Sequence, residues 1–205
     1  MFITFEGVDG SGKSTQAKLL SSYLISKGYR TLLTREPGNG IPEVRDILLS
    51  TQSKLSPLSE VLLFNADRAE HVSRVMKPAL QNGSIVICDR YSDSTRAYQC
   101  GGNRVSKLVA ERIIIEAEQG LVPTLTFLLD IDVKVGIDRV MANRTQKDKY
   151  DNQDPEFYER VSNYFKALSY QDDSRWVVID GNRSSEVVHR EVVSHVLDRL
   201  DPAVF

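Results

Sequence analysis

The fold of this chain is decided by Gly7-Val8-Asp9-Gly10-Ser11-Gly12-Lys13-Ser14, which fits the pattern G-x-x-x-x-G-K-[ST] between an apolar run and a helical segment. Glycines in such a loop allow backbone N–H groups to surround phosphate oxygens, and the following helix N-terminus adds partial positive charge. Lys13 is expected to reach the β- and γ-phosphates of a nucleoside triphosphate, and the Ser14 hydroxyl to bind Mg²⁺. We therefore expect a phosphate-binding loop made of Gly7, Val8, Asp9, Gly10, Ser11, Gly12, Lys13, Ser14 and Thr15.

Short apolar runs recur along the chain and alternate with longer amphipathic segments. The runs are 2–5, 31–33, 85–88, 125–129 and 176–179, and they are rich in β-branched or aromatic residues. Such runs are typical of strands buried on both faces, and their alternation with helices predicts βαβ units. We expect an α/β fold in three layers, with a five-stranded parallel sheet flanked by helices, in a single domain over 1–205. Ligands of such sheets bind beyond the carboxyl ends of the strands.

Composition limits the possible partners. The chain has 205 residues with 26 Lys plus Arg and 28 Asp plus Glu, a formal net charge of -2. Proteins that bind nucleic acid or anionic membranes through their overall field carry a basic excess, so neither partner is expected. Two cysteines are too few for a disulfide framework, no apolar stretch approaches the roughly 18 residues of a spanning helix, and no leader segment precedes the first run. A cytoplasmic protein is expected.

The third run ends in Cys88-Asp89-Arg90-Tyr91. Asp89 is expected to be a carboxylate on the Mg²⁺ side of the phosphate loop, although it could instead cap a helix or pair with Arg90. Arginines also follow other predicted strands: Arg35, Arg45, Arg68, Arg90 and Arg96. Each one alone could be a solvated surface residue. Together they favour a phosphoryl acceptor that is itself an anion, because two polyanions must then be held together against Coulomb repulsion.

Four segments in this order resemble thymidylate kinase of the bacterial type. They are 5–16, 34–38 (Thr-Arg-Glu-Pro-Gly), 63–68 (Leu-Phe-Asn-Ala-Asp-Arg) and 89–99 (Asp-Arg-Tyr-Ser-Asp-Ser-Thr-Arg-Ala-Tyr-Gln), and the resemblance spans nearly the whole chain. It implies a P-loop nucleoside-monophosphate-kinase-like fold that moves the γ-phosphoryl of ATP onto dTMP. The products would be dTDP and ADP, for dTTP biosynthesis, with Mg²⁺ as cofactor. It also implies a homodimer formed through the helices around 56–80.

The resemblance assigns roles to individual residues. Phe64 and Arg68 lie four apart on a predicted helix and would stack on the base and bind its carbonyl; the alternative is a core phenylalanine and an arginine paired with an acid. Tyr98 would crowd the 2′ position of a ribonucleotide. The implied acceptor site comprises Asp9, Arg35, Pro37, Arg45, Phe64, Arg68, Arg90, Ser94, Thr95, Tyr98 and Gln99, and the implied metal ligands are Ser14, Asp89 and Glu36.

A polar segment at about 143–155 is expected to be a lid. Because the phosphate loop carries Gly10 instead of an arginine, the resemblance implies that this lid supplies the transition-state cation, either Arg144 or Lys149. The implied catalytic set is Lys13, Asp9 and Arg90 with Arg144 or Lys149. A solvated charged loop is the alternative interpretation. The loop 38–45 is shorter than the family's usual loop, which leaves open whether Arg45 reaches the phosphate.

Other functional classes are less consistent with the sequence. A GTPase switch needs a guanine-reading N-K-x-D string, which is absent, and the strand before Asp89 continues Arg-Tyr-Ser. A non-catalytic nucleotide-binding module has no need of the acceptor arginines. Another P-loop pyrimidine nucleotide or nucleoside kinase remains the alternative, since preference for thymine depends on one methyl group. The stretch 180–184 lies where the adenine would bind, but it is equally a loop that caps the last helix.

Overall fold

The computed structural model describes residues 1–143 and 148–200. Its centre is a parallel sheet with strand order β2-β3-β1-β4-β5. The strands are β1 (Phe2–Glu6), β2 (Thr31–Arg35), β3 (Ile85–Asp89), β4 (Leu125–Asp130) and β5 (Trp176–Asp180). All five predicted strands are confirmed, and every one extends to a charged residue at its carboxyl end. One edge of the sheet therefore carries a row of titratable side chains.

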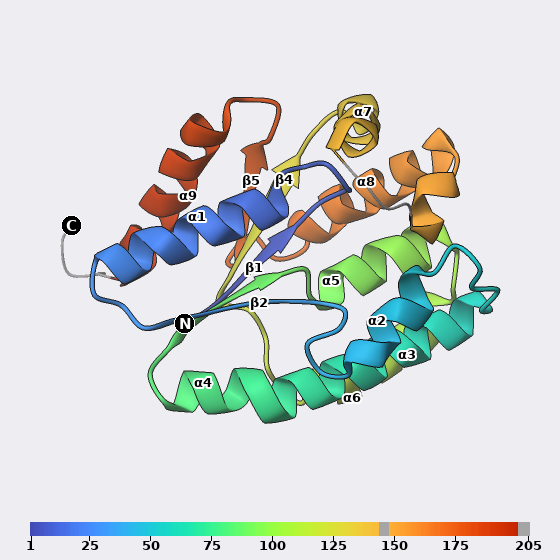
Figure 1. The fold of residues 1–205 in the computed structure, drawn as a ribbon, viewed down its shortest axis with the longest axis horizontal. Helices are drawn as coiled ribbons and strands as arrows, with labels where there is room; N and C mark the ends of the chain where they lie inside the picture. Colours follow the sequence, from blue (N-terminus) through green and yellow to red (C-terminus); the bar gives the residue numbers. More distant parts are fainter. Residues whose placement is uncertain (144–147, 201–205) are drawn as a thin grey trace.

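Helices cover both faces of the sheet, as predicted for three layers (Figure 1). On one face, α1 (Lys13–Ser26) and α9 (Ser185–Leu200) pack against a buried cluster that includes Phe5, Ile87 and Phe127. On the other face, Val86 and Cys88 contact the π-helical segment η1 (Val72–Met76). Also on that face, α8 (Pro155–Ser169) packs against Leu128 and Trp176. Alternate residues of β3 and β4 thus serve opposite faces, so both strands are buried along their length, and Thr126 is the one polar residue before the terminal aspartate of β4.

The remaining helical elements surround this core. They are α2 (Pro42–Leu49), α3 (Pro57–His71), α4 (Lys77–Gln81), α5 (Ser92–Thr95), the π-helical η2 (Arg96–Gly102), α6 (Lys107–Glu118), α7 (Val133–Asn143) and the 3-10 turn η3 (Lys149–Asn152). Ser56 caps the start of α3, because its side chain accepts a 3.3 Å hydrogen bond from Ser59 N, and Pro57 occupies the first turn. Along this helix, Val61 packs on Ala110 and Ile114 of α6.

The part of the expected lid that the structure describes begins at Asp148. Asp148 caps η3, its Oδ1 accepting from Tyr150 N over 2.9 Å, while Asp151 Oδ2 accepts from Asp148 N over 2.7 Å. Asp154 then caps α8 through Phe157 N at 2.6 Å. Arg144, the first candidate for the transition-state cation, lies outside the described residues, as does Lys147. Among the described helices, none has the length and apolar character needed to cross a membrane.

Candidate active site

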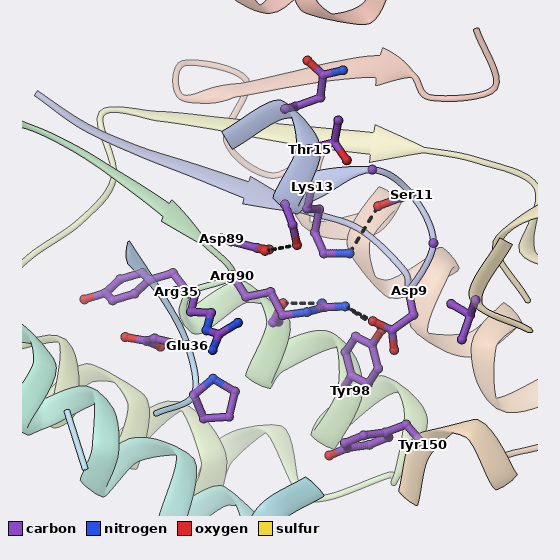
Figure 2. Close-up of a pocket in the computed structure, with 18 of the residues that line it drawn as sticks. Asp9, Ser11, Lys13, Thr15, Arg35, Glu36, Asp89, Arg90, Tyr98 and Tyr150 are labelled. Carbon is purple, nitrogen blue, oxygen red and sulfur yellow. Dashed lines mark hydrogen bonds and ion pairs between the residues drawn. The ribbon is translucent and has the colours of Figure 1, made fainter. Parts of the chain in front are cut away.

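A pocket of about 760 Å³ lies at the carboxyl edge of the sheet (Figure 2). The register explains why its residues meet there: Asp89 at the end of β3 pairs with Phe5 of β1 on one side and with Arg35 of β2 on the other. The predicted residues that line it are Asp9, Gly10, Ser11, Gly12, Lys13, Ser14, Thr15, Arg35, Glu36, Pro37, Arg45, Phe64, Arg68, Asp89, Arg90, Ser94, Thr95, Tyr98 and Gln99. Gly7 and Val8 contribute backbone carbonyls that hold Arg90 and Lys13.

The phosphate-binding loop has the backbone conformation that its glycines permit. Gly10 and Gly12 have φ angles of 78° and 98°, which side-chain-bearing residues rarely adopt. A Cβ on Gly10 would also lie 2.3 Å from the carbonyl oxygen of Gly136, so α7 approaches the loop too closely for any side chain there. This contact explains structurally why the loop itself carries no arginine at position 10.

Lys13 is buried at the base of the loop. Its Nζ donates hydrogen bonds to Val8 O at 2.7 Å and to Ser11 Oγ at 3.3 Å. Burial lowers the pKa of Lys13 from 10.5 to about 8, and the nearby Arg90 guanidinium lowers it further in the same direction. Both of these hydrogen bonds go to uncharged oxygens, and the oxygens of a bound phosphate would stabilise the charged form of Lys13.

Ser14 and Asp89 form the oxygen pair expected on the metal side. Ser14 Oγ donates a hydrogen bond to Asp89 Oδ2 (Figure 2). A hydroxyl and a carboxylate are hard oxygen ligands, and Mg²⁺ commonly takes one or two such protein ligands together with substrate phosphates and water. No cluster of three or more His, Cys, Asp or Glu side chains able to hold a metal occurs within 1–143 and 148–200. The donor set therefore fits a metal that arrives with a nucleotide.

Arg90 connects the end of β3 to the loop. Its backbone is left-handed, with φ 71°, and its Nη1 donates to Gly7 O at 3.1 Å and to Ser94 Oγ at 2.9 Å. Nη2 donates to Asp9 Oδ1 at 2.6 Å and to Tyr98 OH at 3.2 Å. The guanidinium lies over the Tyr98 ring, 4.9 Å from its centroid. Several partners thus fix one cation between the loop and η2.

Glu6, at the end of β1, supports this arrangement and was not predicted. It is fully buried, and its carboxyl accepts from Tyr91 N at 2.8 Å and from Ser94 Oγ at 2.5 Å. Burial raises the pKa of Glu6 from 4.5 to about 8, and the charge of Asp93 adds to that rise. Glu6 therefore binds Tyr91 and Ser94, which follow Arg90 in the chain, without lining the pocket itself. The sequence signal that could have identified Glu6 is a carboxylate at the end of a fully buried strand.

Glu36 is not placed as a metal ligand, which corrects the expectation from the sequence. One of its oxygens accepts from Arg68 Nε at 2.8 Å and the other contacts His71 Nδ1 at 3.0 Å. Glu36 is 5% exposed, and both oxygens are used inside the protein. Its role is to pair with the buried arginine of α3.

Arg68 lines the pocket, but it also fits the alternative of pairing with an acid. It is 1% exposed, and besides Glu36 it donates to Asn65 Oδ1 at 2.6 Å and to Thr95 Oγ1 at 2.9 Å. A guanidinium has five N–H donors, so this pairing leaves donors that can still face the pocket. Phe64, four residues earlier on α3, lines the same pocket and is only partly buried.

The other arginines divide into two groups. Arg35 and Arg45 line the pocket, so Arg45 reaches it despite the shorter loop. Burial, and then the charge of Arg35, lower the pKa of Arg45, which indicates two cations facing the same space. Arg96 is directed elsewhere: it pairs with Glu111 at 3.0 Å and with Glu118 at 3.1 Å on α6. The expectation that Arg96 joins the cluster was wrong.

Lys149 points away from the pocket. Its ammonium pairs with Glu60 of α3 and lies over the Tyr150 ring, 5.1 Å from the centroid, and Lys149 does not line the pocket. The structure therefore argues against Lys149 as the transition-state cation. Its neighbour Tyr150 does line the pocket, and Tyr150 OH accepts from Gln99 Nε2 at 3.0 Å. Tyr150 was not predicted, because no motif marks it.

Two further arginines line the pocket beyond those predicted. Arg139 of α7 donates from Nη1 to Gly10 O at 3.3 Å and to Gly181 O at 3.2 Å, so it joins the phosphate loop to the segment after β5. Arg183 lies in that segment and pairs with Glu191 at 2.5 Å. The sequence placed 180–184 at this end of the site without choosing a side chain, and Arg139 carried no local signal.

Comparisons with known proteins identify the family of this chain. A protein-family model described as thymidylate kinase matches residues 5–192. The chain is 40% identical to a thymidylate kinase of Pelobacter propionicus over 96% of this chain and 93% of the relative. It is also 40% identical to one of Clavibacter sepedonicus over 96% and 95%. A crystal structure of thymidylate kinase from Ehrlichia chaffeensis covers 96% of this chain and 98% of its own, with a TM-score of 0.76 and 36% identity.

Proposed function

The chain belongs to the thymidylate kinase family, and we propose that its pocket transfers the γ-phosphoryl of ATP to dTMP, giving ADP and dTDP for dTTP biosynthesis. The observation that carries this proposal is the meeting of two anion sites in one pocket. The loop with Lys13 forms the first, and Arg35, Arg45 and Arg90, which line the same pocket, form the second. A hydrolase or a nucleotide switch needs only the first of these sites, whereas a phosphoryl transfer between two nucleotides needs both.

ATP is assigned to the loop side. The loop N–H groups and Lys13 hold the β- and γ-phosphates, while Ser14 and Asp89 are the residues that would hold Mg²⁺. When bound, Mg²⁺ supplies charge neutralisation at the β- and γ-phosphate oxygens. Arg139, Gly181 and Arg183 line the pocket next to the loop on its β5 side, and the nucleoside part of ATP is assigned there.

dTMP is assigned to the side formed by β2, α3 and η2. Arg35, Arg45 and Arg90 bind its phosphate, and Phe64 stacks on the base while Arg68 donates to a base carbonyl. The sugar and the rest of the base face the remaining acceptor residues: Asp9, Pro37, Ser94, Thr95, Tyr98 and Gln99. The aromatic Phe64 and the bulky Tyr98 favour a deoxypyrimidine monophosphate over other acceptors.

The chemistry consists of positioning and charge stabilisation. Arg90 and Lys13 both line the pocket and would stabilise the charge of the transferred group, and Asp9 orients Arg90 through its 2.6 Å contact. Arg144 completes the set as the transition-state cation, delivered by a lid at about 143–155 in a single domain of 1–205. Closure of that lid excludes water and so suppresses hydrolysis of ATP.

With this function we also propose that the protein is a homodimer and lies in the cytoplasm. A homodimer is supported by apolar side chains exposed on the packed helices α3 and α6: Leu58, Leu62, Leu108 and Ile115. The two cysteines, Cys88 and Cys100, are buried and unpaired, which suits the reducing cytoplasm where both nucleotide substrates occur.

A label-transfer experiment tests the proposed reaction. The protein is incubated with ATP labelled in its γ-phosphate, Mg²⁺ and dTMP, and the products are separated. The label is expected in dTDP, and its appearance only as inorganic phosphate would contradict the proposal. Ser14→Ala and Asp89→Asn are expected to lower the rate, and a higher Mg²⁺ concentration for half-maximal rate would support their metal role.

A further inference from the structure

The loop between β2 and α2 is fixed by one buried carboxylate. Asp67 of α3 is 0% exposed, and its Oδ2 accepts a 2.8 Å hydrogen bond from Gly38 N. Its Oδ1 accepts from Gly40 N at 3.0 Å and from Ile41 N at 2.5 Å. Three backbone N–H groups of one short loop thus converge on a single side chain. Because both oxygens of Asp67 accept from this loop, the side chain fixes the loop conformation.

The loop is also pressed against the backbone of α3. A Cβ on Gly40 would lie 1.9 Å from the carbonyl oxygen of Asp67 and 2.7 Å from His71 N. Only glycine allows this approach, which brings the loop N–H groups within reach of Asp67. The short loop 38–45 is therefore built onto α3 and does not stand free in solvent.

The same loop determines where Arg45 lies. Ile41 directly precedes α2, and Arg45 is the fourth residue of that helix. Arg45 Nη1 donates to Pro37 O at 2.9 Å. Gly38 has φ 106°, and a Cβ there would lie 2.8 Å from Arg45 Cβ, so the arginine passes directly over this glycine. The peptide unit between Pro37 and Gly38 is therefore shared, because its N–H donates to Asp67 and its carbonyl accepts from Arg45.

Electrostatic repulsion explains why the loop needs such a restraint. Arg35 and Arg45 face the same pocket, and the charge of Arg35 is the second cause, after burial, of the lowered pKa of Arg45. Two like charges tend to separate until an anion arrives. A loop free to move would relieve this repulsion by turning Arg45 outward, and substrate binding would then have to reverse that motion.

From these contacts we propose that Asp67 is a positioning residue for the acceptor phosphate, which holds the loop 38–41 so that Arg45 is already in place when dTMP binds. This inference rests on the proposed function, because it takes Arg45 to be a phosphate ligand. A positioning role can be told from a purely structural role of Asp67 in one respect. The loss of affinity on substituting Asp67 must depend on the phosphate of the ligand and on the presence of Arg45.

Asp67→Asn is the variant of choice. It keeps the side-chain volume and one acceptor oxygen for Gly40 N and Ile41 N, but it turns an amide N–H₂ toward Gly38 N. The matched control is Glu70→Gln on the same helix, where Glu70 pairs with the exposed Arg74. Asp67→Ala is the second variant, and circular dichroism reports whether each variant is folded.

Calorimetry measures the binding of dTMP and of thymidine, which lacks the phosphate. We expect Asp67→Asn to weaken dTMP binding about tenfold, with thymidine binding changed by less than about twofold. In an Arg45→Ala background the added Asp67→Asn change is expected to have little further effect on dTMP binding, because contacting residues are not additive. The KM for dTMP should rise while the KM for ATP stays unchanged.

Two results would overturn the inference. Equal losses of thymidine and dTMP affinity would show that Asp67 supports the base site or the fold as a whole. Independent, multiplying effects of Asp67→Asn and Arg45→Ala would show that Asp67 does not act through Arg45. Failure of the proposed function is distinguishable from both, since it would appear as a wild-type protein that makes no dTDP.

Discussion

Arg90 Nη2 donates a 2.6 Å hydrogen bond to Asp9 Oδ1, and this contact joins the end of β3 to the phosphate-binding loop. Both residues line the pocket, and the guanidinium also contacts Ser94 and Tyr98. A cation at this position is shared between the donor side and the acceptor side of the pocket. Arg90 is therefore the residue on which both dTMP binding and phosphoryl transfer are expected to depend.

Replacing Arg90 by lysine tests that dependence. Lysine keeps the charge but has no planar fork, so it cannot contact Asp9, Ser94 and a phosphate together. We expect kcat/KM for dTMP to fall at least about 100-fold, with ATP affinity nearly unchanged. Arg74→Lys is the control, because the Arg74 side chain is 77% exposed on η1 and does not line the pocket. Comparable kcat/KM values for both variants would remove Arg90 from the reaction.

Discrimination against ribonucleotides is assigned to the Tyr98 ring. Its hydroxyl accepts from Arg90 at 3.2 Å, and the ring lines the pocket. Tyr98→Ala is expected to bring kcat/KM for UMP close to that for dUMP, whereas Tyr98→Phe keeps the ring and the preference for dUMP. The ratio of the two values does not depend on the fraction of folded enzyme, so it remains interpretable if Tyr98→Ala is destabilised. Unchanged discrimination in Tyr98→Ala would refute the assignment.

The two lid candidates for the transition-state cation can be separated by substitution. Arg144→Ala is expected to lower kcat more than about tenfold with little change in dTMP affinity, as expected for a charge that acts on the transition state. Lys149→Ala should affect kcat less, because its ammonium is paired with Glu60. A larger kcat loss in Lys149→Ala would move the role to that residue and would require Glu60 to release it.

The lowered pKa of Lys13 leads us to expect that ATP binding depends on pH. Its pKa is lowered to about 8 by burial and by Arg90, so the free enzyme loses this positive charge as the pH rises through 8. Below that pH the ammonium is intact and ATP affinity should be constant in the neutral range. Between pH 8 and 9.5 the Kd for ATP is expected to rise about tenfold for each added pH unit, because one proton is linked to binding. A Kd that stays flat to pH 9.5 would show that Lys13 remains charged.

The strands and the loop could be predicted because their signals are local. Buried parallel strands require continuous apolar runs such as Ile85–Cys88, and a loop around phosphate requires glycines at fixed spacing. The acidic end of β3 and the arginine beside it follow directly from that frame. These features depend on residues that are close together in the chain, so they can be predicted from the sequence.

The remaining site residues depend on partners that are distant in the chain. Glu6 contacts Tyr91 and Ser94, and Asp67 contacts a loop about thirty residues earlier; neither pairing has a local pattern. Arg96 shows the opposite error. It followed the same strand as Arg90 and was expected in the cluster, but two acids on α6 bind it instead. The sequence shows which residues are charged, but only the packing of the fold shows which charged side chains contact one another.

The central claim is that ATP and dTMP are joined in one pocket, and a coupled ADP-release assay across acceptors tests it most directly. Wild-type protein is supplied with ATP, Mg²⁺ and, in turn, dTMP, dUMP, UMP, dCMP, AMP and thymidine. The account predicts the highest kcat/KM with dTMP and essentially no turnover of thymidine, which offers no phosphate to Arg35, Arg45 and Arg90. Absence of ADP release with dTMP, or faster release with AMP, would contradict it.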